Sequence, residues 1–307
     1  MTASSPRARV LIALLLVILA APGHGLAESQ LTAGTYVVDS KLDAADANPG
    51  DGICRTTAGA CTLRAAIQEA NLDGMDSTIT FAAPFNETNA IQTCNLPPIT
   101  DSGTTIDGSG QWDAVYNRPG IVLTGSACTI MTIDADNTSV YGLLFGGTDS
   151  TGVHITGGTL SHIGGSGAGQ RNVFLALKHG VYVAMSAGVV NTIEYNYFGT
   201  DRGEYSNPGG ETGISVSAAG TVISNNLIVA KSVAGISIGF GQYTFVSDNI
   251  IGLNAFKTSA LPNAVGIVVS GDRNIIGEGN VIAGNTSHGI KVYKGDNNLI
   301  TGNQIGY

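Results

Sequence analysis

Asn226-Leu-Ile228, followed by Gly235-Ile-Ser-Ile238, decides the fold of this chain because the second half of the sequence repeats it. One Asn-led unit begins at residues 172, 226 and 280, and another begins at 196, 249 and 303. The Gly-led unit begins at 180, 235 and 289, so every spacing is between 53 and 55 residues. Several anchors that keep one period of this length are typical of a solenoid, in which each unit packs on its neighbours.

Each repeat contains a short coil and a long coil: Gly213 to Gly235 spans 22 residues, whereas Gly180 to Gly213 spans 33. Alternate residues of a strand point to opposite faces, and we expect the glycine before each strand to form a backbone corner. The predicted inward-facing side chains are Val181, Val183, Ile214, Val216, Ile236, Ile238, Ile290 and Val292. The predicted outward-facing side chains are Tyr182, Ser215, Ser237, Val268 and Lys291.

The recurring asparagines are predicted to be structural. Asparagine tolerates the left-handed conformation of a corner, and amides stacked one coil apart can hydrogen-bond to each other. We therefore expect an asparagine ladder at these corners, formed by Asn172, Asn196, Asn226, Asn249, Asn280 and Asn303.

Composition narrows the class of protein. The 307 residues include 43 glycines, 12% of all residues are charged, and 14 basic residues stand against 23 acidic ones, for a net charge of −9. Abundant Gly, Val, Ile, Thr and Asn suit short strands joined by tight turns. Binding to nucleic acid requires clustered Lys and Arg, which the sequence lacks, so we expect no nucleic-acid partner.

The first 27 residues have the pattern of a secretory signal peptide. Arg7 and Arg9 precede an apolar run from Val10 to Ala21, and small residues follow up to Ala27. A membrane-spanning helix needs roughly 20 apolar residues, more than this run offers, so cleavage is favoured over an uncleaved anchor. We therefore expect a secreted or cell-surface protein with no membrane span in the mature chain.

Export makes the four cysteines candidates for disulfides, and three pairings are possible. We favour Cys54 with Cys61, which closes a short loop, and Cys94 with Cys128, which brackets the first solenoid turns. Four free buried thiols are the alternative. A zinc site is disfavoured, because no histidine or second close cysteine pair lies at ligand spacing.

Residues 62–71 have helical periodicity. One face is apolar and consists of Leu63, Ala66, Ile67 and Ala70. Thr62 is a candidate N-cap, and Leu72-Asp-Gly74 ends the helix. Because a solenoid end exposes strand edges and apolar core, we expect this short helix to be the N-terminal cap.

Asn48-Pro-Gly-Asp-Gly-Ile-Cys54, with Cys61-Thr-Leu-Arg-Ala-Ala-Ile-Gln-Glu-Ala-Asn71, resembles the CSLREA domain, named for its Cys-Ser-Leu-Arg-Glu-Ala signature. This chain has Thr62 in place of the Ser and Ala65 in place of the Glu, so no role of that carboxylate can be carried over. The resemblance implies an exported bacterial protein in which this segment opens a right-handed parallel β-helix. It implies no particular reaction.

The expected fold is therefore all-β: a single-stranded right-handed parallel β-helix with a short N-terminal capping helix. We divide the chain into the signal peptide (1–27), a CSLREA-like cap with the first strands (28–100) and the β-helix (101–307). Early strands are expected at 35–38, 78–81, 96–99, 104–108, 121–123, 130–133 and 140–145, which resemble the opening coils of pectate-lyase-like β-helices. The third repeat breaks off inside a coil, so we expect a longer β-helix, truncated here.

The insertions of the long coils, Gly199 to Pro208 and Gly252 to Pro262, lie one repeat apart and should stack on one side. The candidate ligand-binding residues in them are Asp201, Arg202, Glu204, Tyr205, Asn254, Phe256 and Lys257. Beside them, the residues after the recurring asparagines form a stripe: Val173, Tyr197, Leu227, Ile250, Val281 and Gln304. We expect the insertions, rather than a partner, to cover this stripe. Trp112 lies in a Gly- and Asp-rich loop, and we expect it to cover an early coil, with contact to a ligand as the alternative.

No catalytic or metal-binding motif stands out. Hydrolysis of polysaccharides needs paired carboxylates, whereas Asp248, Asp272 and Glu278 are scattered singly. His179 and His288 are equivalent across two repeats but show no orienting partner, so a turn role is favoured. The loop from Asp43 to Gly52 offers oxygen ligands for calcium, but turn formation is favoured because its spacing fits no EF-hand. We expect no other cofactor.

The leading functional expectation is an exported, non-catalytic β-helix module, a structural or adhesion protein for which carbohydrate or a cell-surface molecule is the candidate partner. The alternative is a polysaccharide lyase or glycoside hydrolase of the pectate-lyase-like class, with active residues that cluster only in three dimensions. A convergent set of acidic and basic side chains on one outward strand face would favour the enzyme.

Overall fold

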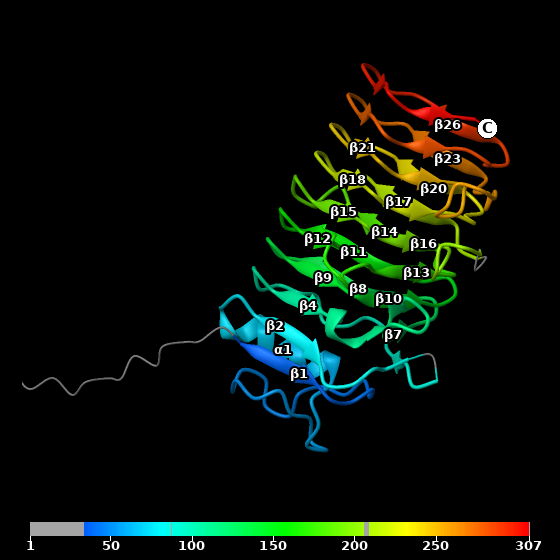
Figure 1. Ribbon diagram of the computed structural model, residues 1–307. Coiled ribbons are helices and arrows are strands. Elements are labelled where there is room, and N and C mark those ends of the chain that lie inside the picture. Colours follow the sequence, from blue (N-terminus) through cyan, green and yellow to red (C-terminus); the bar gives the residue numbers. More distant parts are fainter. Residues whose placement is uncertain (1–33, 87, 206–208, 307) are drawn as a thin grey trace, which may run out of the picture. The chain divides into compact units, whose positions relative to one another are not determined.

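The computed structural model of the protein describes residues 34–86, 88–205 and 209–306. The expected signal peptide lies outside the described residues. Within them, the strands form three parallel sheets, a small hairpin adds two further strands, and one α-helix lies near the beginning. Figure 1 shows the strands stacked coil upon coil from β1 to β26, with α1 beside the first strands.

Sheet I contains β1 (Thr35–Val38), β2 (Thr78–Phe81), β4 (Thr105–Asp107), β9 (Ser139–Tyr141), β12 (His162–Ile163), β15 (Thr192–Glu194), β18 (Val222–Ser224), β21 (Phe245–Ser247), β24 (Ile275–Ile276) and β27 (Leu299–Ile300). Sheet II contains β3 (Ile91–Gln92), β7 (Ile121–Thr124), β10 (Leu143–Gly146), β13 (Val173–Leu175), β16 (Tyr197–Phe198), β19 (Leu227–Ile228), β22 (Ile250–Ile251), β25 (Val281–Ile282) and β28 (Gln304–Ile305).

Sheet III contains β8 (Thr129–Asp134), β11 (Thr151–Gly157), β14 (His179–Val183), β17 (Thr212–Val216), β20 (Ala234–Ile238), β23 (Val265–Val269) and β26 (His288–Val292). The antiparallel hairpin joins β5 (Trp112–Asp113) to β6 (Arg118–Pro119), and a 3₁₀ turn, η1 (Ser109–Gln111), precedes it.

The chain visits the sheets in a constant order, for example β15, β16 and β17 in one coil and β18, β19 and β20 in the next. Each strand pairs in parallel with its equivalents one coil before and one coil after. Every 54-residue repeat is thus two coils of three strands. The fold is a right-handed parallel β-helix, and the expected all-β architecture is confirmed.

Columns of apolar side chains fill the space between the sheets. Val181, Ile214, Ile236, Ile267 and Ile290 are in register across sheet III, and the first four are fully buried. In sheet II the rings of Phe145, Phe174 and Phe198 stack with centroids 5.0 and 4.7 Å apart. The predicted inward-facing set is buried except in the last coil, where Val292 is 47% exposed because it has a strand on one side only.

The recurring glycines have a different role from the one expected. Gly180, Gly213, Gly235, Gly266 and Gly289 do not have the positive φ of a corner residue. A Cβ at Gly180 would instead lie 2.6 Å from both the Gly213 carbonyl oxygen and the Phe198 ring. Glycine is required there because the coils approach too closely for any side chain.

The recurring asparagines stack as a continuous series of hydrogen bonds. Asn196 N donates to Asn226 Oδ1 (3.0 Å), Asn226 N to Asn249 Oδ1 (2.9 Å) and Asn249 N to Asn280 Oδ1 (3.0 Å). At one end Asn172 N donates to Asn196 Oδ1, and at the other Asn280 Nδ2 donates to Asn303 Oδ1. Their Nδ2 groups donate to carbonyl oxygens of the coil before, so the amides satisfy buried backbone groups.

The left-handed conformation lies one residue earlier than predicted. Tyr195, Asn225 and Asp248 have φ values of 57°, 56° and 56°, and Gly279 and Gly302 occupy the equivalent positions. The ladder asparagines that follow them do not have positive φ. The turn therefore directs the side chain of the preceding residue outward and leaves the asparagine inside.

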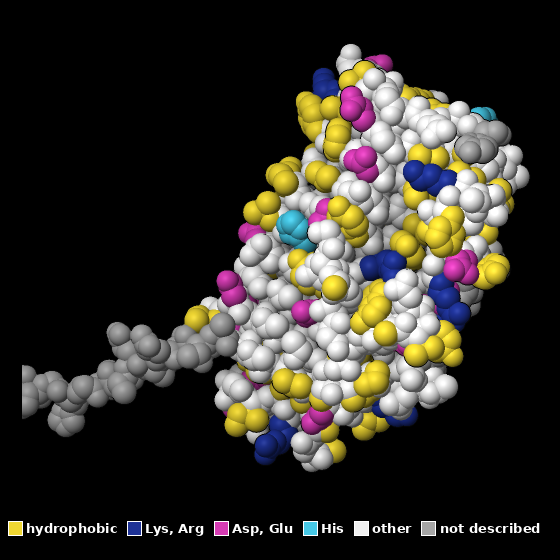
Figure 2. All heavy atoms as spheres, viewed as in Figure 1, with side chains coloured by type: hydrophobic (Ala, Val, Ile, Leu, Met, Phe, Trp, Pro, Cys, Tyr) yellow, Lys and Arg dark blue, Asp and Glu magenta, His cyan; other side chains and the backbone are white. Residues whose placement is uncertain are grey.

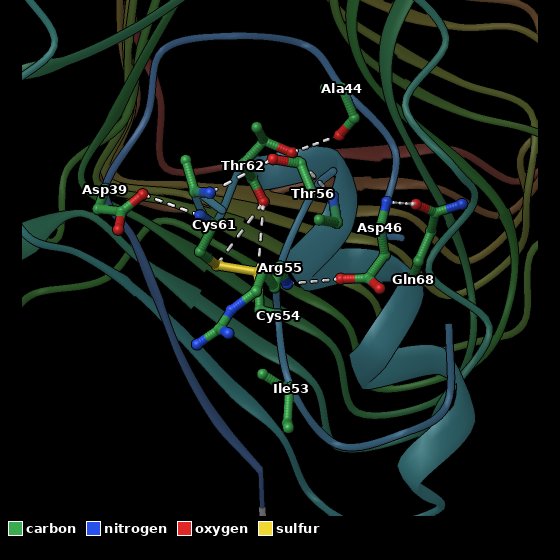
Figure 3. Close-up of a disulfide and its surroundings, with 12 residues drawn as sticks. Asp39, Ala44, Asp46, Ile53, Cys54, Arg55, Thr56, Cys61, Thr62 and Gln68 are labelled. Carbon is green, nitrogen blue, oxygen red and sulfur yellow. Dashed lines mark hydrogen bonds between the residues drawn. A yellow bond between two sulfur atoms is a disulfide. The ribbon is translucent and has the colours of Figure 1, made fainter. Parts of the chain in front are cut away.

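The N-terminal cap forms as expected. Helix α1 (Leu63–Asp73) begins after Thr62, whose side chain accepts a hydrogen bond from Ala65 N at 3.1 Å, and ends at left-handed Gly74. Figure 3 shows the Cys54–Cys61 disulfide at the start of this helix, close to Asp46, which accepts a bond from Arg55 N at 2.7 Å. Cys94 and Cys128 form the second disulfide, so the favoured pairing is confirmed.

Two early strands differ from the prediction. Residues 96–99 do not form a strand, and Ile99 makes a single bridge to Ile133. The apolar stretch 140–145 is divided between β9 and β10 by Gly142, whose φ of 67° turns the chain from sheet I to sheet II. A continuous apolar run thus contains a corner that hydrophobicity alone does not reveal.

Candidate functional site

A groove of about 450 Å³ lies on the outer face of sheet II, beside the beginnings of β16, β19 and β22. Its apolar floor is formed by Leu227, Ile250 and Ala255, and a glycine-rich loop (165–169) forms one edge. Its remaining side chains are three aromatic rings, two amides, one cation and one carboxylate: Trp112, Tyr195, Tyr197, Asn225, Asn226, Arg171 and Asp248.

Arg171 holds two of the aromatic rings in place. Its Cζ lies 4.9 Å from the centroid of the Trp112 ring and 4.0 Å from that of the Tyr197 ring. Nη2 donates to the Asn117 carbonyl oxygen at 2.8 Å, which fixes the guanidinium to the β5–β6 hairpin. Burial lowers the pKa of Arg171, but an arginine stays protonated at any physiological pH. The result is a rigid wall that brings together residues 112, 171 and 197.

Tyr195, Asn225 and Asp248 form a column along the groove. They are the three left-handed residues that precede ladder asparagines, and they lie in adjacent coils. Tyr195 is 37% exposed, and Asn225 and Asp248 are exposed as well. Adjacent coils are about 4.8 Å apart, so the column presents a ring, an amide and a carboxylate at close, regular intervals. Non-glycine residues held at positive φ cluster at ligand sites.

The two insertions stack on each other, as their spacing predicts. Ala255 N donates to Gly203 O at 2.8 Å, and Gly203 packs against Tyr197 and Leu227. The stripe beside them is therefore covered in part. Val173, Leu227 and Val281 are buried, while Tyr197 and Ile250 remain half-buried and face the groove.

The predicted ligand-binding residues of the insertions do not line this groove. Asp201 and Arg202 join a neighbouring cluster instead: Asp201 Oδ2 lies 2.8 Å from Arg118 Nη1, and Arg202 stacks on Tyr116. Glu204, Tyr205, Phe256 and Lys257 are exposed on the outside of the insertions. These residues stay a prediction.

Asn254 differs from the other candidates because it is buried, at 6% exposure, within its own loop. Its Oδ1 accepts from Thr258 N at 2.9 Å, and its Nδ2 donates to Thr258 Oγ1 at 3.1 Å. The Asn254 side chain is thus occupied by local bonds and stabilises the loop.

The candidate calcium loop is organised by the chain itself. Asp43 pairs with Arg64 at 2.8 Å, Asp46 accepts from Asn48 N and Arg55 N, and Asp51 accepts from Ile53 N. No group of three or more His, Cys, Asp or Glu side chains within metal-binding reach occurs in the part of the chain that the structure describes.

The histidines of sheet III lie outside the groove. His154 stacks on Tyr182 at 4.8 Å, and burial lowers the pKa of both His154 and His179. Glu211 opposes that shift at His179 without a hydrogen bond to the ring. The arrangement orients neither imidazole for proton transfer.

The match to a family model agrees with the architecture. Residues 179–307 match the right handed beta helix region. No curated protein is similar in sequence to the chain. The crystal structure of the Dettilon tailspike protein (gp208) is similar at 14% identity and a TM-score of 0.37, over 87% of this chain and 62% of the tailspike chain.

The groove includes part of the predicted stripe, because Tyr197, Leu227 and Ile250 follow ladder asparagines and line it. Sequence reasoning missed the residues before these asparagines, at 195, 225 and 248, whose side chains also face outward. The available signal for these outward side chains was that tyrosine, asparagine and aspartate occupy turn positions at which other coils have glycine. Arg171 occupies the same position, directly before Asn172, whereas Trp112 reaches the groove through a loop that does not repeat.

Proposed function

We propose that this protein is an exported, non-catalytic β-helix module that binds a glycan in the groove of sheet II. Sugar rings present apolar faces that stack on aromatic side chains and hydroxyls that bond to amides and carboxylates. Trp112, Tyr195 and Tyr197 supply the stacking surfaces, and Asn225 and Asp248 supply the polar partners. The single observation that carries the proposal is the Trp112–Arg171–Tyr197 stack, which fixes aromatic rings in advance of binding.

Export and a surface location are supported by other features. The leader at 1–27 has the signal-peptide pattern, and both disulfides are of the kind that persists in oxidising compartments. The resemblance of residues 48–71 to the CSLREA domain is in line with an exported protein. No helix among the described residues is long and apolar enough to span a bilayer.

The non-catalytic part of the proposal rests on the chemistry of the groove. Hydrolysis of a glycosidic bond commonly needs two carboxylates about 5 to 9 Å apart. Asp248 is the one carboxylate among the residues that line the groove. Figure 2 shows, on one face of the molecule, acidic and basic side chains interspersed over a mostly uncharged surface. Such a surface suits uncharged hydroxyl-rich ligands at least as well as strongly charged polymers.

Trp112 is the chain's one tryptophan, so its fluorescence reports directly on the groove. Purified protein is titrated with a panel of neutral and acidic oligosaccharides, and we expect at least one to shift the emission saturably. Tyr195→Asn removes the ring while tolerating positive φ. It should weaken binding of that ligand by about 5- to 30-fold, because one stacked ring contributes about 1–2 kcal/mol.

Tyr205→Ala and Phe256→Ala are the matched controls, because both rings are exposed on the insertions outside the groove. They should bind the ligand as tightly as the wild type. If these controls lose binding while Tyr195→Asn retains it, the assignment of the binding site to the groove is overturned and the insertions are favoured as the binding site. Release of reducing ends or unsaturated sugars from the bound polysaccharide would identify the protein as an enzyme.

A further inference from the structure

Lys231 occupies a corner of the β-helix core, between β19 and β20. Its backbone N donates to Asn263 Oδ1 at 3.0 Å, and Asn263 N in turn donates to Asn285 Oδ1 at 3.3 Å. A second, shorter asparagine ladder thus runs along this corner, and Lys231 takes the ladder position in its coil. The side chain is only 2% exposed, and it is the one lysine among the largest fully buried side chains.

Within the part of the chain that the structure describes, no acidic side chain forms an ion pair with the buried amine. The hydrogen bond recorded for Nζ among the described residues is a long one, 3.5 Å to the Gly209 carbonyl oxygen. Burial alone accounts for the lowering of the Lys231 pKa from 10.5 to about 8, with no contribution from a neighbouring charge. Glu211, in the preceding long coil, and Lys178 are charged groups that act on His179. A buried ammonium of this kind is costly unless something neutralises it.

Lys231 lines a pocket of about 560 Å³ that is separate from the groove. The pocket lies at the ends of β19 and β22, whereas the groove lies at their beginnings. Ser232 donates to Gly210 O at 3.1 Å, while the hydroxyl of Thr286 makes no recorded bond within the described residues. The pocket therefore offers one cation and one free hydroxyl donor in a wall of small residues.

We propose that this pocket binds a small carboxylate, with the Lys231 ammonium as its counter-ion and the Thr286 hydroxyl as a second donor. One ammonium is balanced by one singly charged group, whereas a phosphate dianion would leave excess negative charge next to a chain of net charge −9. The site is independent of the proposed glycan groove, because the two share no lining residue.

The test is thermal unfolding of the full chain in sodium acetate, sodium sulfate or sodium phosphate, each matched to sodium chloride at equal ionic strength. At pH 7 we expect acetate to raise the Tm saturably, because a ligand that binds only the folded state stabilises it. The apparent affinity for acetate should fall about tenfold at pH 9, where about nine-tenths of an amine of pKa about 8 is neutral.

Lys231→Met and Lys231→Gln should both lose the response to acetate, and two variants are used in case one fails to fold. Equal Tm values in acetate and chloride for the wild type would overturn the proposal. So would an acetate response that persists in the variants, since it would be a general salt effect. A larger response to sulfate or phosphate than to acetate would overturn the assignment to a carboxylate.

Discussion

Asn249 illustrates how a single ladder residue stabilises two coils. Its Oδ1 accepts from Asn226 N, and its Nδ2 donates to the carbonyl oxygens of Ile223 and Ser247 at 2.9 and 2.8 Å. Asn249→Ala would leave these buried groups without partners, so we expect the free energy of unfolding to fall by about 3 kcal/mol. Urea denaturation measures this as a lower midpoint at an unchanged slope.

The control for that change is Asn225→Gly, one coil away. Asn225 is exposed, makes no recorded side-chain bond and has a φ of 56°, which glycine adopts freely. Replacing the Asn225 side chain in this way should change the free energy of unfolding by less than about 1 kcal/mol. Similar losses in both variants would contradict a special role for the ladder.

Lys231 should make stability depend on pH in a defined direction. Its pKa is lower in the folded chain (about 8) than in the unfolded chain (10.5), so the unfolded state holds more protons between these values. The wild type therefore gains stability as the pH rises from 8 to 10.5 and carries the full cost below pH 8. That cost is at most about 3 kcal/mol.

Lys231→Met removes the titrating group. We expect this variant to be more stable than the wild type at pH 7, without added carboxylate, and the difference to shrink at pH 9.5. Urea denaturation of both proteins at the two pH values measures it, and other titrations cancel in the comparison. A difference that stays constant with pH would show that the pKa of Lys231 is the same in the folded and the unfolded chain, which would contradict its burial as an unpaired amine.

At the scale of elements, the two disulfides fasten the cap. Cys54–Cys61 closes a loop of 7 residues at the start of α1, and Cys94–Cys128 closes one of 34 residues between β3 and β8. Arg64 of α1 donates to the Cys94 carbonyl oxygen at 3.1 Å, so the second bridge also anchors the helix. From loop entropy alone, we expect the first bridge to stabilise the folded state by about 2 kcal/mol and the second by about 4 kcal/mol.

We therefore expect the double variant Cys94→Ser/Cys128→Ser to lose more stability than Cys54→Ser/Cys61→Ser. Thermal unfolding under non-reducing conditions measures both, with mass spectrometry to verify the remaining bridge. Equal losses would mean that the unfolded chain is too compact for the loop-length argument to hold.

At the scale of the whole molecule, stability comes from repetition. One core column runs from Ile91 and Leu123 to Ile305, one side chain per coil, and includes Phe145, Phe174, Phe198, Ile228 and Ile251. Removing residues 235–288 joins Ala234 to Gly289 and deletes one complete repeat, so every remaining strand keeps an equivalent neighbour. We expect this shortened chain to fold.

Circular dichroism should retain the strand signal, and the urea m-value should fall by about a fifth, because 54 of the 276 residues of the unit 32–307 are removed. Deletion of residues 235–249 is the control, because it joins the entrance of a sheet III strand to a sheet II strand and should prevent folding. Equal behaviour of the two deletions would contradict the coil-by-coil account.

The sequence by itself determined the β-helix, the capping helix and the disulfides. These features depend on patterns that recur at a fixed spacing or lie close together in the chain, so each copy specifies its own strand and its neighbour. The conformation of the corners was predicted less accurately from the sequence, because glycine and asparagine each suit several backbone roles. Gly180 is required because neighbouring coils approach each other closely at this position. Asn226 directly follows the left-handed residue and is not itself left-handed.

Only the tertiary structure decided where ligands can bind. Trp112, Arg171, Tyr195 and Asp248 meet in one groove although they come from four different coils or loops, and Lys231 becomes a core residue in a ladder of amides. Inward positions repeat because each must fit the one above it. Outward and loop positions have no such constraint, so their meeting depends on how the coils stack and which loops fold back over them.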